Sequence, residues 1–364
     1  MFLSIYRNIP GIFFSTIIAY AGIYLSSFIG NELLNLSKSP VSPIMLSIII
    51  GLIIGNTLKI PSIFSEGIKF SLKFILRLGI ICLGIRLGLL DILKVGVIGI
   101  PLIISCIIIS IILVNYFCKF LHVPSKIGSL IAVGTSICGA SAIVATSPAI
   151  NANKEEVTYA IANITIFGIV AMFVYPFLAH YLFNGDELFI GLFLGTSIHE
   201  TAQVAGAGLI YSEQYNSPST MDIATITKLV RNVSMIIVIP FISYLYLKNN
   251  IDKKNNKPSI LSMFPIFIIG FIIMGLIRSI GDYGIQSSDQ AFGIFLNDQW
   301  QLIITYIKSL AEYSLAIAMA AVGVSTNLVS LRSLGIRPFY VGFAAAMSVG
   351  IISYIGIFFL NYFI

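Results

Sequence analysis

Charged side chains are scarce in this sequence, at 10% of its 364 residues, whereas a soluble domain carries about 25%. A chain of this size with so few charges lacks the polar surface that a water-soluble globule needs. Hydrophobic residues make up 57% of the chain, and the mean hydropathy is +0.98. The composition therefore excludes an ordinary soluble enzyme and predicts many membrane crossings through apolar runs of roughly 20 residues.

Several chemical motifs are also absent. The four cysteines lie in apolar runs without a CxxC spacing, which predicts buried thiols and neither a disulfide framework nor a zinc site. No GxxxxGK[ST] phosphate-binding loop is present, so ATP hydrolysis would need a partner subunit. The HETAQ stretch at 199–203 lacks the second histidine of the zinc-protease HExxH motif. The net charge is +6, and the excess Lys and Arg residues are expected in cytoplasmic loops, so no nucleic-acid partner is predicted.

The hydropathy pattern predicts an all-α polytopic membrane protein with about 10–11 transmembrane helices in one domain over residues 1–364. The expected spans are 10–29, 41–58, 68–90, 95–117, 127–150, 157–183, 187–212, 222–247, 259–280, 302–327 and 336–363. The first apolar run is too long for a signal-peptide core, so we expect an uncleaved span there. Residues 248–258, KNNIDKKNNKP, are expected to form a polar cytoplasmic linker between two packing units.

Lys and Arg are concentrated in alternate loops between the expected spans. Because positive residues stay on the cytoplasmic side of an inner membrane, this bias predicts eleven spans with the N-terminus in the cytoplasm and the C-terminus outside. The loop at 184–187 is acidic although the same bias assigns it to the cytoplasm.

Small and hydroxyl residues cluster in the fifth and seventh expected spans. The fifth contains GTSIC at 134–138, and the seventh repeats this pattern as GTSIH at 195–199. Two interpretations are open for the glycines: close helix packing through small residues, or unwound helices that present backbone groups to a solute. The hydroxyls and the nearby charges favour the second. The hydroxyl and amide side chains concerned are Thr135, Ser136, Ser141, Thr196, Ser197 and Gln203.

Ionisable residues in the seventh and eighth spans indicate a polar interior. His199 and Glu200 lie about 18 Å into their span at ~1.5 Å per residue, near the membrane midplane. Burial there costs at least about 2.5–3.5 kcal/mol per charge, so such groups normally face a functional interior. Lys228 and Arg231 share one face of the eighth span. Lys228 either snorkels to the interface or faces the interior. Arg231 is expected in the interior, where it could pair with Glu200.

If Glu200 pairs with Arg231, the charge of Lys228 remains uncompensated and His199 can add a proton, so a cavity lined by these residues prefers an anion. In a proton-coupled cycle His199 or Glu200 would carry the proton, because histidine titrates near neutrality. Na⁺ is the other candidate coupling ion, since hydroxyls and unwound carbonyls of the fifth and seventh spans could coordinate it.

Five long motifs give the chain a family resemblance over nearly its whole length. They are GIRLGLLDI at 84–92, GTSICGASAIVAT at 134–146, GTSIHETAQVAGAG at 195–208, KLVR at 228–231 and AMAAVGVSTNL at 318–328. With these motifs the chain resembles the YeiH family of bacterial membrane proteins, often labelled sulfate exporters. The resemblance implies a multi-pass transporter related to the bile-acid and arsenite carriers, with two discontinuous helices, inverted repeats, and sulfate or sulfite export. It also carries the family's motif positions onto Thr135, Ser136 and Ser141, onto His199, Glu200 and Gln203, and onto Lys228 and Arg231.

Together these observations predict a secondary transporter for a small anion, with no enzymatic activity and no bound cofactor or metal. Its expected partners are the anionic solute and membrane lipid, and a homo-oligomer is one candidate assembly. The alternatives are an intramembrane enzyme that uses His199 and Glu200 as an acid–base pair, and a channel. The predicted substrate-binding residues are Thr135, Ser136, Ser141, Thr196, Ser197, His199, Glu200, Gln203, Lys228 and Arg231.

Overall fold

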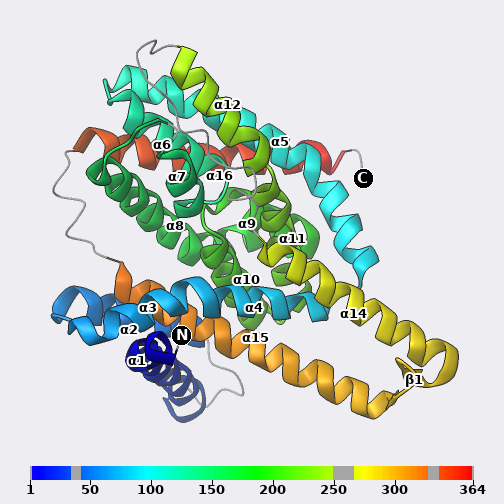
Figure 1. Cartoon of the computed structure of the whole chain (residues 1–364). Coiled ribbons are helices and arrows are strands. Elements are labelled where there is room, and N and C mark those ends of the chain that lie inside the picture. Colours follow the sequence, from blue (N-terminus) through cyan, green and yellow to red (C-terminus); the bar gives the residue numbers. More distant parts are fainter. Residues whose placement is uncertain (1, 34–41, 149, 249–265, 327–335, 363–364) are drawn as a thin grey trace. The chain divides into compact units, whose positions relative to one another are not determined.

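The computed structural model describes residues 2–33, 42–148, 150–248, 266–326 and 336–362. Helices dominate these ranges, and the strands within them form one antiparallel hairpin of β1 (Gln290–Ala291) and β2 (Phe295–Leu296) (Figure 1). The predicted all-α membrane fold is therefore confirmed. Apart from Lys248, the polar linker predicted at 248–258 lies outside the described residues.

The chain divides into two compact units that are interleaved in the sequence. The first unit comprises residues 1–95, 212–218 and 266–326. In it, α15 packs against α2 and α4, and α1 packs against α2. Glycines permit the contact between α2 and α15, because a Cβ atom at Gly323 would lie 2.4 Å from the Ile48 carbonyl oxygen. The elements of this unit are α1 (Phe2–Ser27), η1 (Phe28–Leu33), α2 (Pro43–Thr57), η2 (Ser62–Phe64), α3 (Ser65–Phe70), η3 (Ser71–Ile75), α4 (Leu76–Leu83), η4 (Gly84–Arg86), α14 (Phe267–Ser288), the hairpin and α15 (Asn297–Ser325).

The second unit comprises residues 96–211, 219–265 and 327–364, and it contains both GTSI motifs. Here α6 packs against α7, α8 and α16, and α9 packs against α8 and α16. Asn153 and Glu156 form a capping box that starts α8. The helices of this unit are α6 (Ser125–Ser136), α7 (Ala140–Thr146), α8 (Lys154–Leu182), α9 (Glu187–Ser197), α12 (Met235–Lys248), α16 (Ile336–Leu360), and most of α5 (Leu89–Phe120), α10 (Thr201–Tyr215) and α11 (Pro218–Val233).

Fewer helices than expected are long and apolar enough to cross a membrane alone. Within the described ranges there are six, and α11 with α12, bent by 43°, makes a seventh. The predicted second span is the 15-residue helix α2. The predicted fifth and seventh spans are each a pair of short helices, α6 with α7 and α9 with α10. The two discontinuous helices expected from the sequence are therefore present.

Candidate functional site

In both discontinuous helices the first half ends at the serine of a GTSI motif, and the break begins at the isoleucine. Helix α6 ends at Ser136 and α7 begins at Ala140, while α9 ends at Ser197 and α10 begins at Thr201. Gly139 makes the first break possible, because its φ of +71° and ψ of −127° strongly favour glycine. We call residues 137–139 and 198–200 together the double break.

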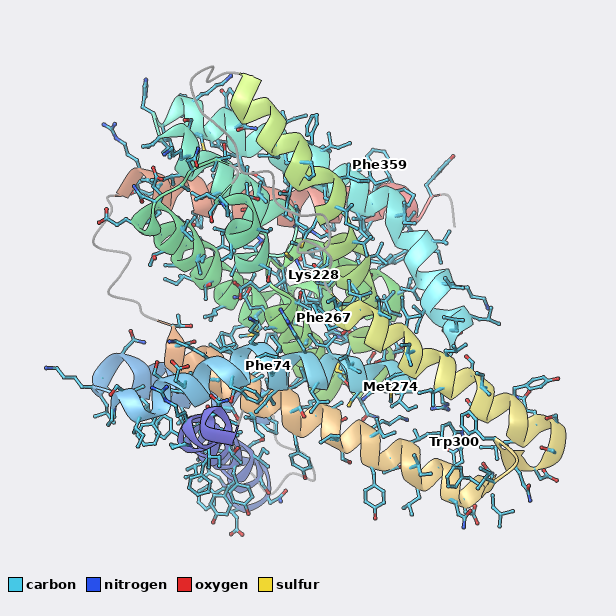
Figure 2. All side chains as sticks on the ribbon, viewed as in Figure 1. Phe74, Lys228, Phe267, Met274, Trp300 and Phe359 are labelled. Atoms are coloured by element: carbon cyan, nitrogen blue, oxygen red, sulfur yellow. The ribbon has the colours of Figure 1, made fainter. Side chains whose placement is uncertain are left out.

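A helix leaves its last carbonyl groups without partners in the same helix, and in a membrane interior each unpaired group costs several kcal/mol. Lys228 of α11, which is 0% exposed, satisfies three such carbonyls. Its Nζ donates to the carbonyl oxygens of Ile137 at 2.9 Å, Ile198 at 2.8 Å and His199 at 2.5 Å. An ammonium group has three N–H donors, so all of them are used. Figure 2 shows this side chain among the helices of the second unit.

Arg231, one helical turn further along α11, is also 0% exposed and binds four carbonyls. Its Nε donates to Ser136 at 2.8 Å, its Nη1 donates to Thr196 at 2.5 Å and to Ile198 at 3.4 Å, and its Nη2 donates to Thr135. The two cations thus cap the C-terminal ends of α6 and α9. They also face the negative end of each helix dipole, which favours a positive charge there.

Neither cation takes the role that charge counting suggests. Among the described residues, no carboxylate oxygen lies within 4.0 Å of Lys228 or Arg231. The expected pairing of Glu200 with Arg231 is therefore not formed, and Lys228 does not snorkel outward because its side chain is fully buried. With every N–H of Lys228 already donated to a carbonyl, this side chain has no donor left for an anion in this conformation.

Glu200 lies at the contact between the two breaks. Its Oε1 accepts hydrogen bonds from the Ala140 backbone N–H at 3.4 Å and the Thr165 hydroxyl at 3.3 Å. The Glu200 backbone N–H donates to Oε1 of Gln203 at 3.2 Å, and Nε2 of Gln203 donates to the Thr165 carbonyl at 3.0 Å. A Cβ atom at Gly139 would lie 2.4 Å from Cγ of Glu200. Glycine at this break therefore leaves the space that the Glu200 side chain occupies.

Two buried polar atoms at the second break have no hydrogen-bond partner. His199 is 1% exposed and its Nδ1 is unpartnered. Asn232 is 2% exposed; its Nδ2 donates to the hydroxyl of Thr201 at 3.0 Å, and its Oδ1 is unpartnered. Unpaired buried polar atoms are rare in native proteins and mark places where water or a solute would bind.

The predicted hydroxyl residues contribute mainly through their backbones. Thr196 donates its hydroxyl to the Leu192 carbonyl at 2.7 Å and lies 2.6 Å from the Ser353 hydroxyl, and Ser197 donates to Phe193 at 2.5 Å. Ser136 donates to Val133 at 3.4 Å. The carbonyl groups of Thr135, Ser136 and Thr196 instead bind Arg231. Ser141 is exposed on the first turn of α7.

Sequence reasoning missed three residues of this site, namely Asn232, Thr165 and Thr201. Asn232 directly follows the KLVR segment, and this position beside two buried cations was the available signal. Thr165 lies in α8, where the surrounding sequence gives no indication of a role. Thr201 follows HE in the seventh span, where its hydroxyl meets Asn232.

Charge at the double break remains positive even when Glu200 is ionised. Lys228 and Arg231 bring two positive charges. The C-terminal ends of α6 and α9, each equivalent to about −0.5, are offset by the N-terminal ends of α7 and α10, each equivalent to about +0.5. An ionised Glu200 thus leaves the site about one charge unit positive, and a protonated or displaced Glu200 about two. Within the described part of the chain, no group of three or more His, Cys, Asp or Glu side chains could hold a metal ion.

Comparison with known proteins gives one consistent result. A family model described as Conserved hypothetical protein 698 matches residues 10–342. A UPF0324 membrane protein of Fusobacterium nucleatum is 34% identical over 310 residues, which are 84% of this chain and 87% of the relative. A UPF0324 membrane protein of Streptococcus agalactiae is 32% identical over 347 residues, with 95% and 96% covered. One from Streptococcus pyogenes is 30% identical over 348 residues, with the same coverage. No solved structure matches.

Proposed function

Because the chain belongs to the UPF0324 family of membrane proteins, we propose that it is a secondary transporter for a small anion that binds at the double break. The observation that carries this proposal is the pair of fully buried cations that bind carbonyls and no carboxylate. Sulfate and sulfite, which the resemblance to the YeiH family implies, are the first candidate substrates, and export is the expected direction.

The anion would lie at the start of α10, beside Glu200. Helix N-termini carry free N–H groups and the positive end of the helix dipole, which suits an anion. Nδ1 of His199, which has no partner, can donate to an anion in the tautomer that carries its proton there, and Nδ2 of Asn232 has a second N–H besides the one it gives to Thr201. Both groups lie at or beside this first turn. Lys228 and Arg231 act there through their charge, since their N–H groups are directed to carbonyls. These features give the second discontinuous helix the polar groups that anion recognition needs.

Coupling to protons follows from the charge balance. An incoming anion and an ionised Glu200 would compete for the same positive region. Anion entry is therefore favoured when Glu200 takes up a proton or moves away, and anion release is favoured when it ionises again. Glu200 is the proton carrier in this scheme, and His199 is the second candidate.

This function requires no cofactor and assigns no catalytic residue. The partners are the anionic solute and membrane lipid. On the Lys and Arg bias, we place the protein in a bacterial inner membrane with a cytoplasmic N-terminus. The alternatives remain outcomes of the test: an enzyme would turn over its substrate in detergent, and a channel would pass the anion downhill without moving protons.

The test is uptake of labelled sulfate and sulfite by sealed liposomes under a set pH gradient, with Glu200→Gln and the control Glu155→Gln. Glu155 is exposed on the first turn of α8. Wild-type and control proteins should give flux that follows the pH gradient, whereas Glu200→Gln should carry the anion independently of it. Folded protein that moves no member of a panel of inorganic and organic anions, in either direction, would refute the transporter proposal.

A further inference from the structure

We propose that Lys228 is a built-in cation that occupies the place where a coupling Na⁺ would bind, so that transport by this protein is independent of Na⁺. The transport part of this inference rests on the function proposed above. The cation-site part does not, because protein stability alone can test it.

The geometry around Lys228 is that of a site for a monovalent cation. Three backbone carbonyl oxygens, one from the first break and two from the second, converge on a single nitrogen at 2.5–2.9 Å. In transporters with discontinuous helices, unwound carbonyls and half-helix C-terminal ends are the groups that coordinate Na⁺. Here the same kinds of oxygen bind an ammonium group that is covalently attached to α11. A tethered cation and a bound Na⁺ carry equal charge, and both satisfy the carbonyls.

Electrostatics argues against a second, mobile cation beside Lys228. Arg231 lies one turn away on the same helix and is equally buried. His199, which adjoins Glu200 in the second break, has a fully buried ring that adds no negative charge. From the elements packed around the ammonium, Glu200 is the carboxylate that faces it, and Cys138 contributes a thiol. Three cations against one carboxylate in a medium of low dielectric constant would repel one another strongly. Na⁺ therefore has neither free ligands nor a favourable potential at this site.

Removal of the ammonium should turn the site into one that binds Na⁺. In Lys228→Ala the three carbonyl oxygens lose the ammonium group and still face the space that the side chain leaves, and the Ile198 carbonyl keeps its 3.4 Å bond from Arg231. Binding of Na⁺ to the folded protein alone stabilises it in proportion to the logarithm of ion concentration. The variant should therefore unfold several degrees below wild type in choline chloride, and NaCl at equal ionic strength should restore much of that loss.

A matched control separates this effect from a general effect of salt. Lys126 donates to one backbone carbonyl, that of Asn151, at 2.7 Å, and its side chain is 24% exposed. Lys126→Ala removes a lysine with one carbonyl partner and an ion pair to Glu156 at 4.0 Å, and it leaves no converging set of carbonyl oxygens behind in the described part of the chain. Its Tm should be the same in NaCl and in choline chloride, as should that of wild-type protein.

The experiment measures Tm of wild type, Lys228→Ala and Lys126→Ala in NaCl, KCl and choline chloride, together with wild-type anion flux with and without Na⁺. Folded Lys228→Ala that does not respond to Na⁺, or wild type that Na⁺ stabilises specifically, would overturn the inference. If Lys228→Ala does not fold, wild-type flux decides, because dependence on Na⁺ overturns the inference. Absence of any flux would instead refute the proposed function and leave the Tm comparison intact.

Discussion

Arg231 offers the sharpest test of how the two broken helices are held in place. Arg231→Met keeps most of the side-chain length and removes every N–H donor. The Ile198 carbonyl keeps its bond to Lys228, but Thr135, Ser136 and Thr196 lose their charged donor. The substitution therefore leaves three buried carbonyls at the ends of two helices without the group that caps them.

Each buried hydrogen bond to a charged group contributes about 1.5–3 kcal/mol. Three lost bonds would sum to roughly 5–9 kcal/mol at full value. Relaxation of the helix ends and entry of water reduce this, so we expect a loss of at least about 3 kcal/mol, the lower end for breaking a buried charged network. At about 2.1 cal/mol/K of unfolding entropy per residue, 364 residues give roughly 1.3 °C per kcal/mol, so Tm should fall by at least about 4 °C. Arg231→Lys retains the charge and has three donors on a shorter side chain, so its Tm should lie between those of wild type and Arg231→Met.

Buried cysteines make the measurement direct. All four thiols are free and buried, so a thiol-reactive fluorescent dye reports unfolding during a temperature ramp in detergent. Arg7→Met serves as the control, because Arg7 is exposed and its removal should leave Tm unchanged. An Arg231→Met protein with the Tm of wild type would refute the capping role of Arg231, and with it the charge balance on which the proposed function depends.

Three further predictions concern other parts of the chain. Gly139→Ala should lower Tm more than Gly293→Ala does. Both positions have a positive φ, which strains alanine by about 1–3 kcal/mol, but only at Gly139 would the new Cβ also lie 2.4 Å from another side chain. Equal losses of Tm would contradict this. Gln203→Leu removes hydrogen bonds of 3.2 and 3.0 Å and should lower the unfolding free energy by about 1–3 kcal/mol, measured by thiol accessibility. Asp282→Ala should shift the emission of Trp300, the one tryptophan of the sequence, because it removes the carboxylate oxygen that accepts from the indole N–H at 2.8 Å. Unchanged emission would contradict this contact.

The breaks themselves were predictable, but the partners of the buried cations were not. Glycine, threonine and serine in both GTSI motifs signal weak helices, and the structure ends α6 and α9 within those motifs. Backbone carbonyls, however, belong to every residue and leave no mark in the sequence. The charges in the sequence therefore predicted Glu200 or a solute as the partners of Lys228 and Arg231, whereas in the structure both side chains bind backbone carbonyls.

Hydropathy also could not distinguish a continuous span from a bent or short one. The predicted span at 222–247 is α11 and α12, which meet at a bend of 43°. No proline or glycine, the residues that usually indicate a bend, occurs between Arg231 and Met235. The bend is instead accompanied by Ser234, whose hydroxyl donates to the Arg231 carbonyl at 2.6 Å. A side chain that bonds to a backbone carbonyl competes with regular helix hydrogen bonding, and this competition depends on context that a hydropathy window does not contain.

The repeated motif and the KLVR segment act as one structural device. Each GTSI motif ends a helix and leaves carbonyls exposed, and the i, i+3 spacing of Lys228 and Arg231 places both cations on one face of α11. Lys228 and Arg231 each bind carbonyls from both discontinuous helices, so one helix holds two helix ends. Because the N–H groups of both cations are directed to carbonyls, hydrogen bonding to a solute falls to the side chains that remain incompletely bonded. Those are His199 and Asn232, together with the carboxylate of Glu200, whose charge sets whether an anion can enter.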